Sequence, residues 1–365
     1  MAVQDPGIYE FCSLTATEDQ ATSYARQRGL LLSEGVLQQA QRQQQQQPQC
    51  LLGTVGCNGD VHPAKKHRAD RGKDYEGFRC TKCKKFRCAK NALVQGEIRG
   101  AAQGNELRSF FATLGADGKS HTKVSIKAAL AVIYFWAKDL SMLQTQHLLP
   151  ESISGTETYV NWRNYIREVC QRSLNDAPPM GGPGEIVQID ESLMRGRRKY
   201  NRGRLLRGNR VPPARQNYGN QVVGPWIFGM VWKRPDGKQD LRMFHVLRHN
   251  ELTLRPIIER HIAPGTLIRS DEWAAYRNIS TWQGFNYVHE TVNHQENFVD
   301  PITGANTQRI ECHWGHVKTE ILRKMRGTSP NLLPGHLAAY WWKKMHNEAP
   351  FNTIVDEIAT QFPLI

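Results

Sequence analysis

The chain has 365 residues, enough for two or three domains, and its 48 Lys and Arg against 34 Asp and Glu give a formal net charge of +14. Such an excess of positive charge favours a polyanionic partner such as nucleic acid. The longest uncharged apolar run, Ala128–Ala137, is too short to span a bilayer. The first residues also lack the basic and then apolar pattern of a secretory signal. We therefore expect no membrane partner and no secretion.

The N-terminal part predicts a small helical segment over residues 1–37. Thr17 and Gln20 have the spacing of a capping box, and Gly29 stands where a helix would stop. Residues 38–49 are nearly all Gln. Such a tract cannot bury apolar surface, so it predicts a flexible linker.

Five of the eight cysteines lie close together, between Cys50 and Cys88. Without a secretory signal, this clustering indicates metal binding rather than disulfides, and residues 50–92 predict a zinc ribbon. The expected Zn²⁺ ligands are Cys50, Cys57, Cys80 and Cys83, with Cys88 and His62 as substitutes for one of them. The first pair is spaced more widely than usual, so a loop with reduced cysteines is the alternative.

Residues 105–175 predict a helical region. The expected helices are Lys123–Leu140, Ser141–Leu148 and Thr156–Val169. The last two, joined by a tight turn, suit a helix-turn-helix with Arg163 and Arg167 facing DNA. An ordinary helical hairpin explains the pattern equally well. Asp176–Gly184, with three Pro and three Gly, predicts a domain boundary.

After this boundary the periodicity changes to that of an α/β domain with antiparallel leading strands. The expected strands are Glu185–Asp190, Trp226–Trp232, Met243–Leu247, Thr266–Ser270 and Tyr287–His289. The expected helices are Glu251–Ile262, Thr307–Lys324 and Pro334–His346.

Three acids stand where such domains place their chemistry. Asp190 and Asp271 end strands, and Glu311 lies in the first turn of a helix that we expect Thr307 to cap. Converging carboxylates repel one another unless cations lie between them, and oxygen ligands suit Mg²⁺ or Mn²⁺. Two such ions support phosphoryl transfer. Each acid alone could simply cap a turn or helix, and four neighbours compete for these roles: Glu191, Glu272, Glu296 and Asp300.

A series of short motifs resembles Merlin-type DDE transposases, which are related to bacterial insertion-sequence transposases with an ISXO-like domain. The motifs are Ile189-Asp190-Glu191-Ser192, Lys199–Arg204, Trp226–Gly229, Ser270–Trp273, Val292–His294, Asn297–Pro301, Thr303–Thr307, Ile310–Trp314 and Lys318. The resemblance is carried by their order and covers about residues 180–345. A looser resemblance covers the N-terminal part.

The resemblance implies a ribonuclease-H-like catalytic domain over residues 180–330, with a mixed sheet flanked by helices, and leaves 331–365 as a C-terminal helical segment. Its catalytic triad falls on Asp190, Asp271 and Glu311, which would bind two Mg²⁺ or Mn²⁺ ions. Aligned in the same way, the motifs leave Glu272 and Glu296 outside the triad. It further implies a transposase that cleaves and joins double-stranded DNA at the ends of a mobile element, acting as a homo-oligomer.

Residues 195–215 contain nine basic residues and no acid. We expect them to contact the DNA backbone, although a solvated charged loop is the alternative. The predicted DNA contacts there are Arg195, Arg197, Arg198, Lys199, Arg202 and Arg204. Lys318, two helical turns beyond Glu311, could reach a phosphate. His294 and His316 are expected to be structural, and Trp273 and Trp314 to lie in the core.

Other functional classes fit the sequence less well. A domesticated transposase with a dead catalytic domain would bind DNA without cutting it, but the acids are intact. A metal-dependent nuclease without strand joining is a nearer alternative. No motif set of a tyrosine or serine recombinase stands out. The chain is expected to be nuclear if it is eukaryotic, and otherwise cytoplasmic.

Overall fold

The computed structural model describes residues 4–34, 49–50, 54–55, 57, 59–68, 73–88, 110–111, 124–149, 153, 155–194, 225–293, 298–324 and 328–363. The chain divides into two compact units. The first unit comprises Met1–Val169 with Glu348–Ile365, and the second comprises Cys170–Asn347. Within the described ranges, none of the helices has the length and hydropathy that a membrane span requires.

In the described part of the first unit, helices are the main elements. They are α1 (Ile8–Leu14), α2 (Glu18–Gln27), α4 (Ile126–Ala137), α5 (Met142–Leu148), α10 (Pro350–Gln361) and the first part of α6 (Thr156–Asp176). The rings of Phe11 and Tyr134 stack at 4.1 Å, and Phe351 of α10 packs edge-on to both. The Asp5 carboxylate accepts hydrogen bonds from two amides in the first turn of α10. The chain's last helix therefore completes the core of its first unit.

Side-chain caps set several helix starts. The predicted capping box of α2 is confirmed, because the Gln20 amide donates to Thr17 Oγ1 and the Thr17 amide donates to Gln20 Oε1. Ser141 and Gln144 form a second box at the start of α5. Helix α6 continues seven residues past its predicted end at Val169. Its buried stripe runs on through Cys170 and Leu174, and no proline interrupts the helix.

Short antiparallel strands complete the first unit. β1 (Gln49–Cys50) pairs with β2 (Thr54–Val55). β3 (Val61–Arg68), β4 (Lys73–Cys80) and β5 (Phe86–Cys88) form a three-stranded antiparallel sheet.

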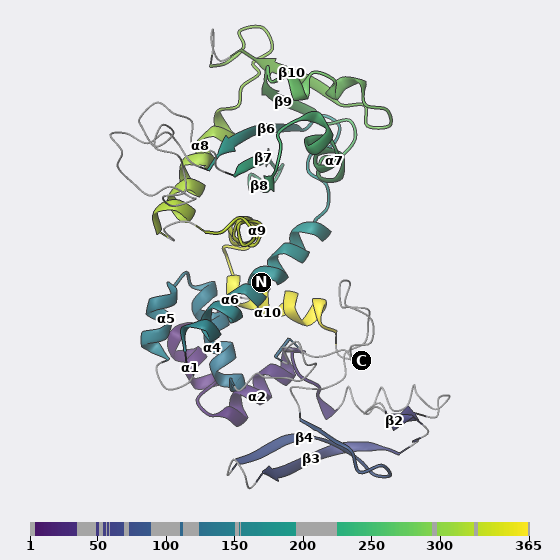
Figure 1. Cartoon of the computed structure of the whole chain (residues 1–365), viewed down its shortest axis with the longest axis vertical. Coiled ribbons are helices and arrows are strands. Elements are labelled where there is room, and N and C mark those ends of the chain that lie inside the picture. Colours follow the sequence, from purple (N-terminus) through teal and green to yellow (C-terminus); the bar gives the residue numbers. More distant parts are fainter. Residues whose placement is uncertain are drawn as a thin grey trace, which may run out of the picture. The chain divides into compact units, whose positions relative to one another are not determined.

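The second unit is built on a five-stranded mixed sheet. Its strands are β6 (Ile186–Leu193), β7 (Trp226–Lys233), β8 (Gln239–Val246), β9 (Leu267–Asp271) and β10 (Val288–Val292), in the order β10-β9-β6-β7-β8. β6, β7 and β8 are antiparallel neighbours, whereas β9 and β10 run parallel to β6. The strands β6, β8, β9 and β10 therefore all end at one edge, which we call the carboxyl edge. The predicted mixed α/β sheet with antiparallel leading strands is confirmed (Figure 1).

Helices cover both faces of this sheet (Figure 1). On one face, α7 (Glu251–His261) and the short helical turns η5 (Ala274–Tyr276) and η6 (Ile279–Thr281) bury a cluster that includes Ile189, Phe228 and Ile258. On the other face, α8 (Gln308–Lys318) and α9 (Leu333–Met345) bury Ile227, Val231 and Trp314. The predicted helix 307–324 is α8 followed by a π-helical stretch, η7 (Thr319–Lys324).

A buried ion pair joins the outermost strand β8 to its surroundings. The Arg242 guanidinium donates to both carboxylate oxygens of Asp240, and Trp341 of α9 donates to the same carboxylate at 2.8 Å. Arg242 Nη1 also lies 3.1 Å from His261 Nδ1. Burial, followed by the charge of Arg242, lowers the pKa of His261 to about 4, so the neutral ring accepts this hydrogen bond. The pair therefore links α7 and α9 to the same strand.

Candidate active site at the carboxyl edge

Two of the three predicted acids lie at the same level of neighbouring strands. Gln188 of β6 stands opposite Arg269 of the parallel strand β9. Two residues further along each strand are Asp190 and Asp271, so their side chains leave the sheet on the same face. Adjacent strands lie about 4.8 Å apart, which brings the two carboxylates close together.

The third acid is carried by a helix that is fastened to the same strand. The buried side chain of Gln188 accepts hydrogen bonds from the amides of Arg309 and Ile310, at 3.1 and 3.3 Å, in the first turn of α8. Its own amide group donates to Asn306 Oδ1 at 2.9 Å. Gln188, two residues before Asp190 on β6, therefore fixes the start of α8 and with it Glu311.

Thr307 differs from its predicted role. It occupies the N-cap position of α8, but its hydroxyl caps no amide of that helix. The hydroxyl donates instead to Glu311 Oε1 at 2.6 Å. Because Gln188 already satisfies the amides of the first turn, the Thr307 side chain is available to orient the Glu311 carboxylate.

A tryptophan and a glycine fix the position of Asp190. The Trp314 indole N–H donates to Asp190 Oδ2 at 2.7 Å. Gly229 of β7 stands opposite Asp190 in the register, and a Cβ atom there would lie 2.6 Å from the Trp314 ring. The absence of a side chain at Gly229 lets the indole pack against the sheet. Trp314 is in the core, as predicted, and it also contacts an acid of the site.

Asp190 lies close enough to Asp271, Glu311 and Lys318 for their charges to act on one another. Burial, together with the negative charges of Asp271 and Glu311, raises the pKa of Asp190 to about 6, although the Trp314 hydrogen bond lowers it in part. Burial lowers the pKa of Lys318, and the charge of Asp190 opposes that change. Lys318 therefore lies within electrostatic reach of Asp190.

The carboxylate set suits a hard divalent cation, because its donors are all oxygen atoms and their mutual repulsion favours a counter-charge. The three side chains do not close around one point as they stand. In the part of the chain that the structure describes, only a cysteine group brings three potential ligand atoms within 4.8 Å of one another.

The competing acids have other surroundings. Glu191 points away from Asp190, because neighbouring residues of a strand face opposite sides. Burial, and then the charges of Asp190 and Asp271, raise the pKa of Glu191 to about 8, with the Tyr276 hydroxyl opposing part of this rise. Asp300 accepts hydrogen bonds from Thr303 and Ile302 in a turn. Glu272 is exposed, and Glu296 lies outside the described residues.

Most of the predicted DNA contacts lie outside the described residues: Arg195, Arg197, Arg198, Lys199, Arg202 and Arg204. His294, which was expected to be structural, lies outside them as well. The other predicted histidine, His316, is exposed on α8. In the first unit, Arg163 of α6 donates to the Leu140 carbonyl and to Thr145, so it links α6 to the start of α5. Burial lowers the pKa of Arg163 to about 10. Arg167 donates to Asn164 on its own helix.

One expectation about the core is wrong. Trp273 is 43% exposed, although an apolar ring next to a buried strand end was expected to be buried. Its indole N–H donates to the His249 carbonyl at 2.9 Å, and this bond holds the ring over the carboxyl edge.

A second candidate site lies in the first unit. Cys57, Cys80 and Cys83 bring their sulfur atoms within 4.8 Å of one another, and the Sγ atoms of Cys57 and Cys80 are 3.6 Å apart. A Cβ atom on Gly59 would lie 2.6 Å from Cys80 Sγ, so the chain passes close around the sulfurs. Three clustered thiols are a suitable donor set for Zn²⁺. Cys50 and Cys88 lie in β1 and β5, with side chains outside the described set.

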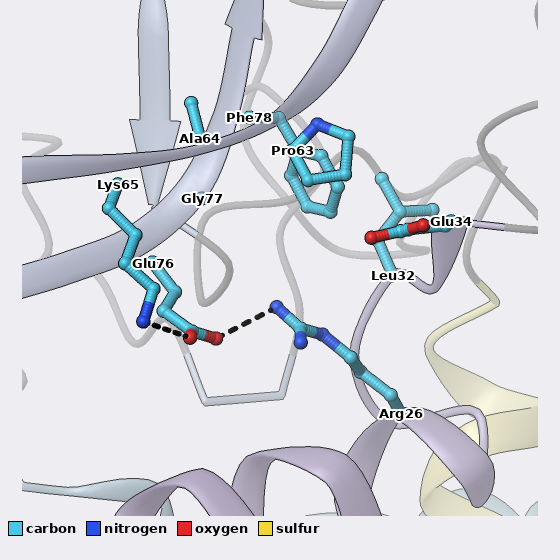
Figure 2. A pocket seen from close by; sticks show the side chains of 9 residues that line it. All are labelled: Arg26, Leu32, Glu34, Pro63, Ala64, Lys65, Glu76, Gly77 and Phe78. Carbon is cyan, nitrogen blue, oxygen red and sulfur yellow. Dashed lines mark hydrogen bonds and ion pairs between the residues drawn. The ribbon is translucent and has the colours of Figure 1, made fainter.

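A pocket of about 320 Å³ lies between α2 and the β3–β4 hairpin (Figure 2). Arg26 and Lys65 both point toward Glu76 and pair with its carboxylate, each at 3.3 Å. Leu32 and Phe78 contribute apolar lining. Because its central charges are paired with each other, the pocket offers no acid or nucleophile set comparable to the carboxyl edge.

Comparison with known families identifies the second unit. Residues 182–344 match the family described as an ISXO2-like transposase domain. The mixed sheet and its acid-bearing edge thus belong to a transposase domain. More narrowly, the match is to the ISXO-like domain that the sequence motifs resemble. The match lies within the second unit and does not extend into the first. No curated protein matches the chain.

Proposed function

We propose that this protein is an active DDE transposase of the Merlin type, which cleaves DNA at the ends of its mobile element and joins those ends to target DNA. One observation carries the proposal. Within a transposase-family domain, Asp190 and Asp271 lie level on neighbouring strands, and Gln188 fastens the helix of Glu311 to the first of those strands. The same arrangement supports a ribonuclease-H-like fold.

In this proposal the three carboxylates hold two divalent ions, Mg²⁺ or Mn²⁺. When bound, such a pair of ions supplies nucleophile activation and stabilisation of the leaving oxygen in phosphoryl transfer. The Trp314 N–H and the Thr307 hydroxyl hold Asp190 and Glu311 in orientation. Lys318 contacts an oxygen of the scissile phosphate from the same side of α8. Water first cleaves a strand, and the resulting 3′-hydroxyl then attacks target DNA.

We further propose that double-stranded DNA is held by the basic segment 195–215 and by the first unit, with a homo-oligomer assembling on the element ends. Arg167 remains a proposed DNA contact in the first unit. The internal hydrogen bonds of Arg163 instead favour a role in positioning α6. In a eukaryotic cell, such a protein would act in the nucleus.

The triad is tested by Asp190→Asn, Asp271→Asn and Glu311→Gln. Each should abolish cleavage of element-end DNA in Mg²⁺ or Mn²⁺ while leaving gel-shift binding close to that of the wild type. The exposed neighbour Glu272→Gln is the matched control and should retain cleavage. A triad variant that cleaves like the wild type removes that residue from the proposed site. Cleavage without joined products would make the protein a nuclease, and binding without cleavage by the wild type would make it a domesticated DNA-binding protein.

We also propose that Cys57, Cys80 and Cys83 bind a structural Zn²⁺ with a fourth ligand from Cys50. Purified protein should then contain about one Zn²⁺ per chain, and Cys80→Ser should lose it. Gly59→Ala should lower zinc content as well, because the added methyl group would collide with Cys80 Sγ. Gly7→Ala, where the methyl group meets no atom within 4 Å, is the matched control. Metal analysis that finds no zinc in freshly purified protein would exclude the site.

A further inference from the structure

Three aromatic rings form a continuous stack at the carboxyl edge. The rings of Trp226 and His249 lie 4.1 Å apart with an angle of 22° between their planes. The rings of His249 and Trp273 lie 5.0 Å apart with an angle of 13°. Trp226 begins β7, His249 follows β8, and Trp273 follows β9. Three different segments therefore contribute to one ordered stack.

The stack meets the proposed catalytic acids at Trp273, whereas Trp226 lies on the sheet face that packs against α7, opposite to the face of Asp190. Trp226 pairs with Leu193 near the end of β6, three residues beyond Asp190. The amide of Trp273 donates to Asp271 Oδ1 at 3.1 Å, so the backbone of the tryptophan is joined to a member of the triad. A phosphodiester held at those acids would bring its adjoining nucleotides to this edge of the sheet.

The outer ring of the stack is open and held in place. Trp273 is 43% exposed, while its indole N–H is bound to the His249 carbonyl. A planar ring that is exposed and already ordered can stack on another ring at little entropic cost. Arg248, exposed in the same loop as His249, supplies a positive charge beside it. An aromatic platform next to positive charge is the arrangement that binds unpaired nucleobases.

We infer that Trp273, supported by His249 and Trp226, is a stacking platform for an unpaired DNA base next to the scissile phosphate. This inference rests on the proposed function, because it takes the phosphate to be bound at Asp190, Asp271 and Glu311. The platform recognises any base through its ring face, so it contributes affinity for frayed or cleaved DNA ends and little sequence preference.

The test uses the full-length protein with Ca²⁺ in place of Mg²⁺ to prevent cleavage. The probes are a blunt DNA duplex and the same duplex with a short unpaired 3′ tail, which carries a fluorescent base analogue quenched by stacking. The wild type should quench the analogue and bind the tailed duplex more tightly than the blunt one. Trp273→Ala should lose the quenching and lower affinity for the tailed duplex about tenfold, with little change for the blunt duplex.

Trp273→Phe, which keeps a ring, should retain most of both effects. Tyr9→Ala, which removes an exposed ring from the first unit, should change neither. Equal quenching by the wild type and Trp273→Ala, or an equal loss of affinity for both duplexes, would overturn the platform. A parallel cleavage assay in Mg²⁺ separates the two ideas. If the wild type cleaves DNA and Trp273→Ala behaves like the wild type with the tailed duplex, the platform is wrong and the proposed function stands. If the wild type quenches the analogue and Asp271→Asn still cleaves normally, the proposed triad is wrong and the platform stands.

Discussion

Asp190 is costly to ionise in the folded protein, because it is largely buried and lies near two other acids. Its pKa rises from 3.8 to about 6. A carboxyl group with a raised folded pKa stabilises the native state fully below its unfolded pKa, and that contribution is lost as the pH rises through the folded pKa. Without divalent ions, the wild type should therefore lose stability between about pH 4 and 6.

Asp190→Asn should reduce this loss, because the amide cannot ionise and its oxygen can still accept from Trp314. Above about pH 6 the variant should exceed the wild type in free energy of unfolding by roughly 1–3 kcal/mol, with a small difference near pH 4. Denaturant unfolding across this range checks the prediction, with Glu272→Gln as control. Added Mg²⁺ should stabilise the wild type more than the variant. A constant difference at every pH would contradict the assignment of a raised pKa to Asp190.

The sequence offered local patterns for the proposed acids and fewer for the residues that hold them in place. Asp271 ends β9 and Glu311 lies in the first turn of α8, and such positions can be read from local patterns. The predicted strand end at Asp190 is wrong, because β6 continues to Leu193 and stays paired with β7 over that length. The role of Gln188 could not be read in this way, because its bonds reach residues more than one hundred positions away. The local signal was a polar residue between the apolar Val187 and Ile189. The exposure of Trp273 likewise depends on a loop that follows a different strand.

The junction between α8 and the sheet depends on Gly229. A methyl group there would lie 2.6 Å from the Trp314 ring and 3.0 Å from the Ile310 side chain, both of which are buried. Gly229→Ala should therefore displace α8, destabilise the protein by roughly 1–3 kcal/mol and slow cleavage on the order of a hundredfold.

Gly315→Ala, on α8 itself, is the matched control. Its methyl group meets no atom within 4 Å, and Ala favours a helix over Gly by about 1 kcal/mol. This variant should be as stable as the wild type or more stable, and it should cleave normally. Unfolding curves and cleavage rates for the pair decide the matter. Equal effects of the two substitutions would show that α8 tolerates a shift at the sheet.

At the scale of elements, periodicity predicted the strands and helices of the second unit, with shifts at their ends. β8 begins four residues earlier than predicted, because Asp240 and Arg242 are buried as an ion pair and obscure the apolar pattern. α10 was not predicted as a separate helix. Its partners, α4 and the N-terminal segment, lie more than two hundred residues away in sequence, so local patterns carried no sign of its packing.

At the scale of the whole molecule, the net charge of +14 favours a polyanionic partner such as DNA. Several arginines in the described second unit are already paired with acids. Arg242 pairs with Asp240, Arg255 with Glu259 and Arg269 with Glu290. Arginines that are already paired release few counterions from DNA, whereas the segment 195–215 carries nine basic residues and no acid. We therefore expect that segment to dominate the salt dependence of DNA binding.

Replacing Arg197, Arg198, Arg202 and Arg204 by Gln should lower the slope of log affinity against log salt by about one for each phosphate that the protein no longer neutralises. Preference among DNA sequences should change little, because phosphate contacts position the duplex and base contacts specify it. Cleavage should fall more than binding, since a misplacement of about 1 Å at the scissile phosphate can cost on the order of a hundredfold in rate. Arg255→Gln, which removes an arginine already paired with Glu259, is the control and should leave the slope nearly unchanged. If the fourfold variant keeps both the wild-type slope and the wild-type cleavage rate, the segment is a solvated charged surface and the DNA is held elsewhere.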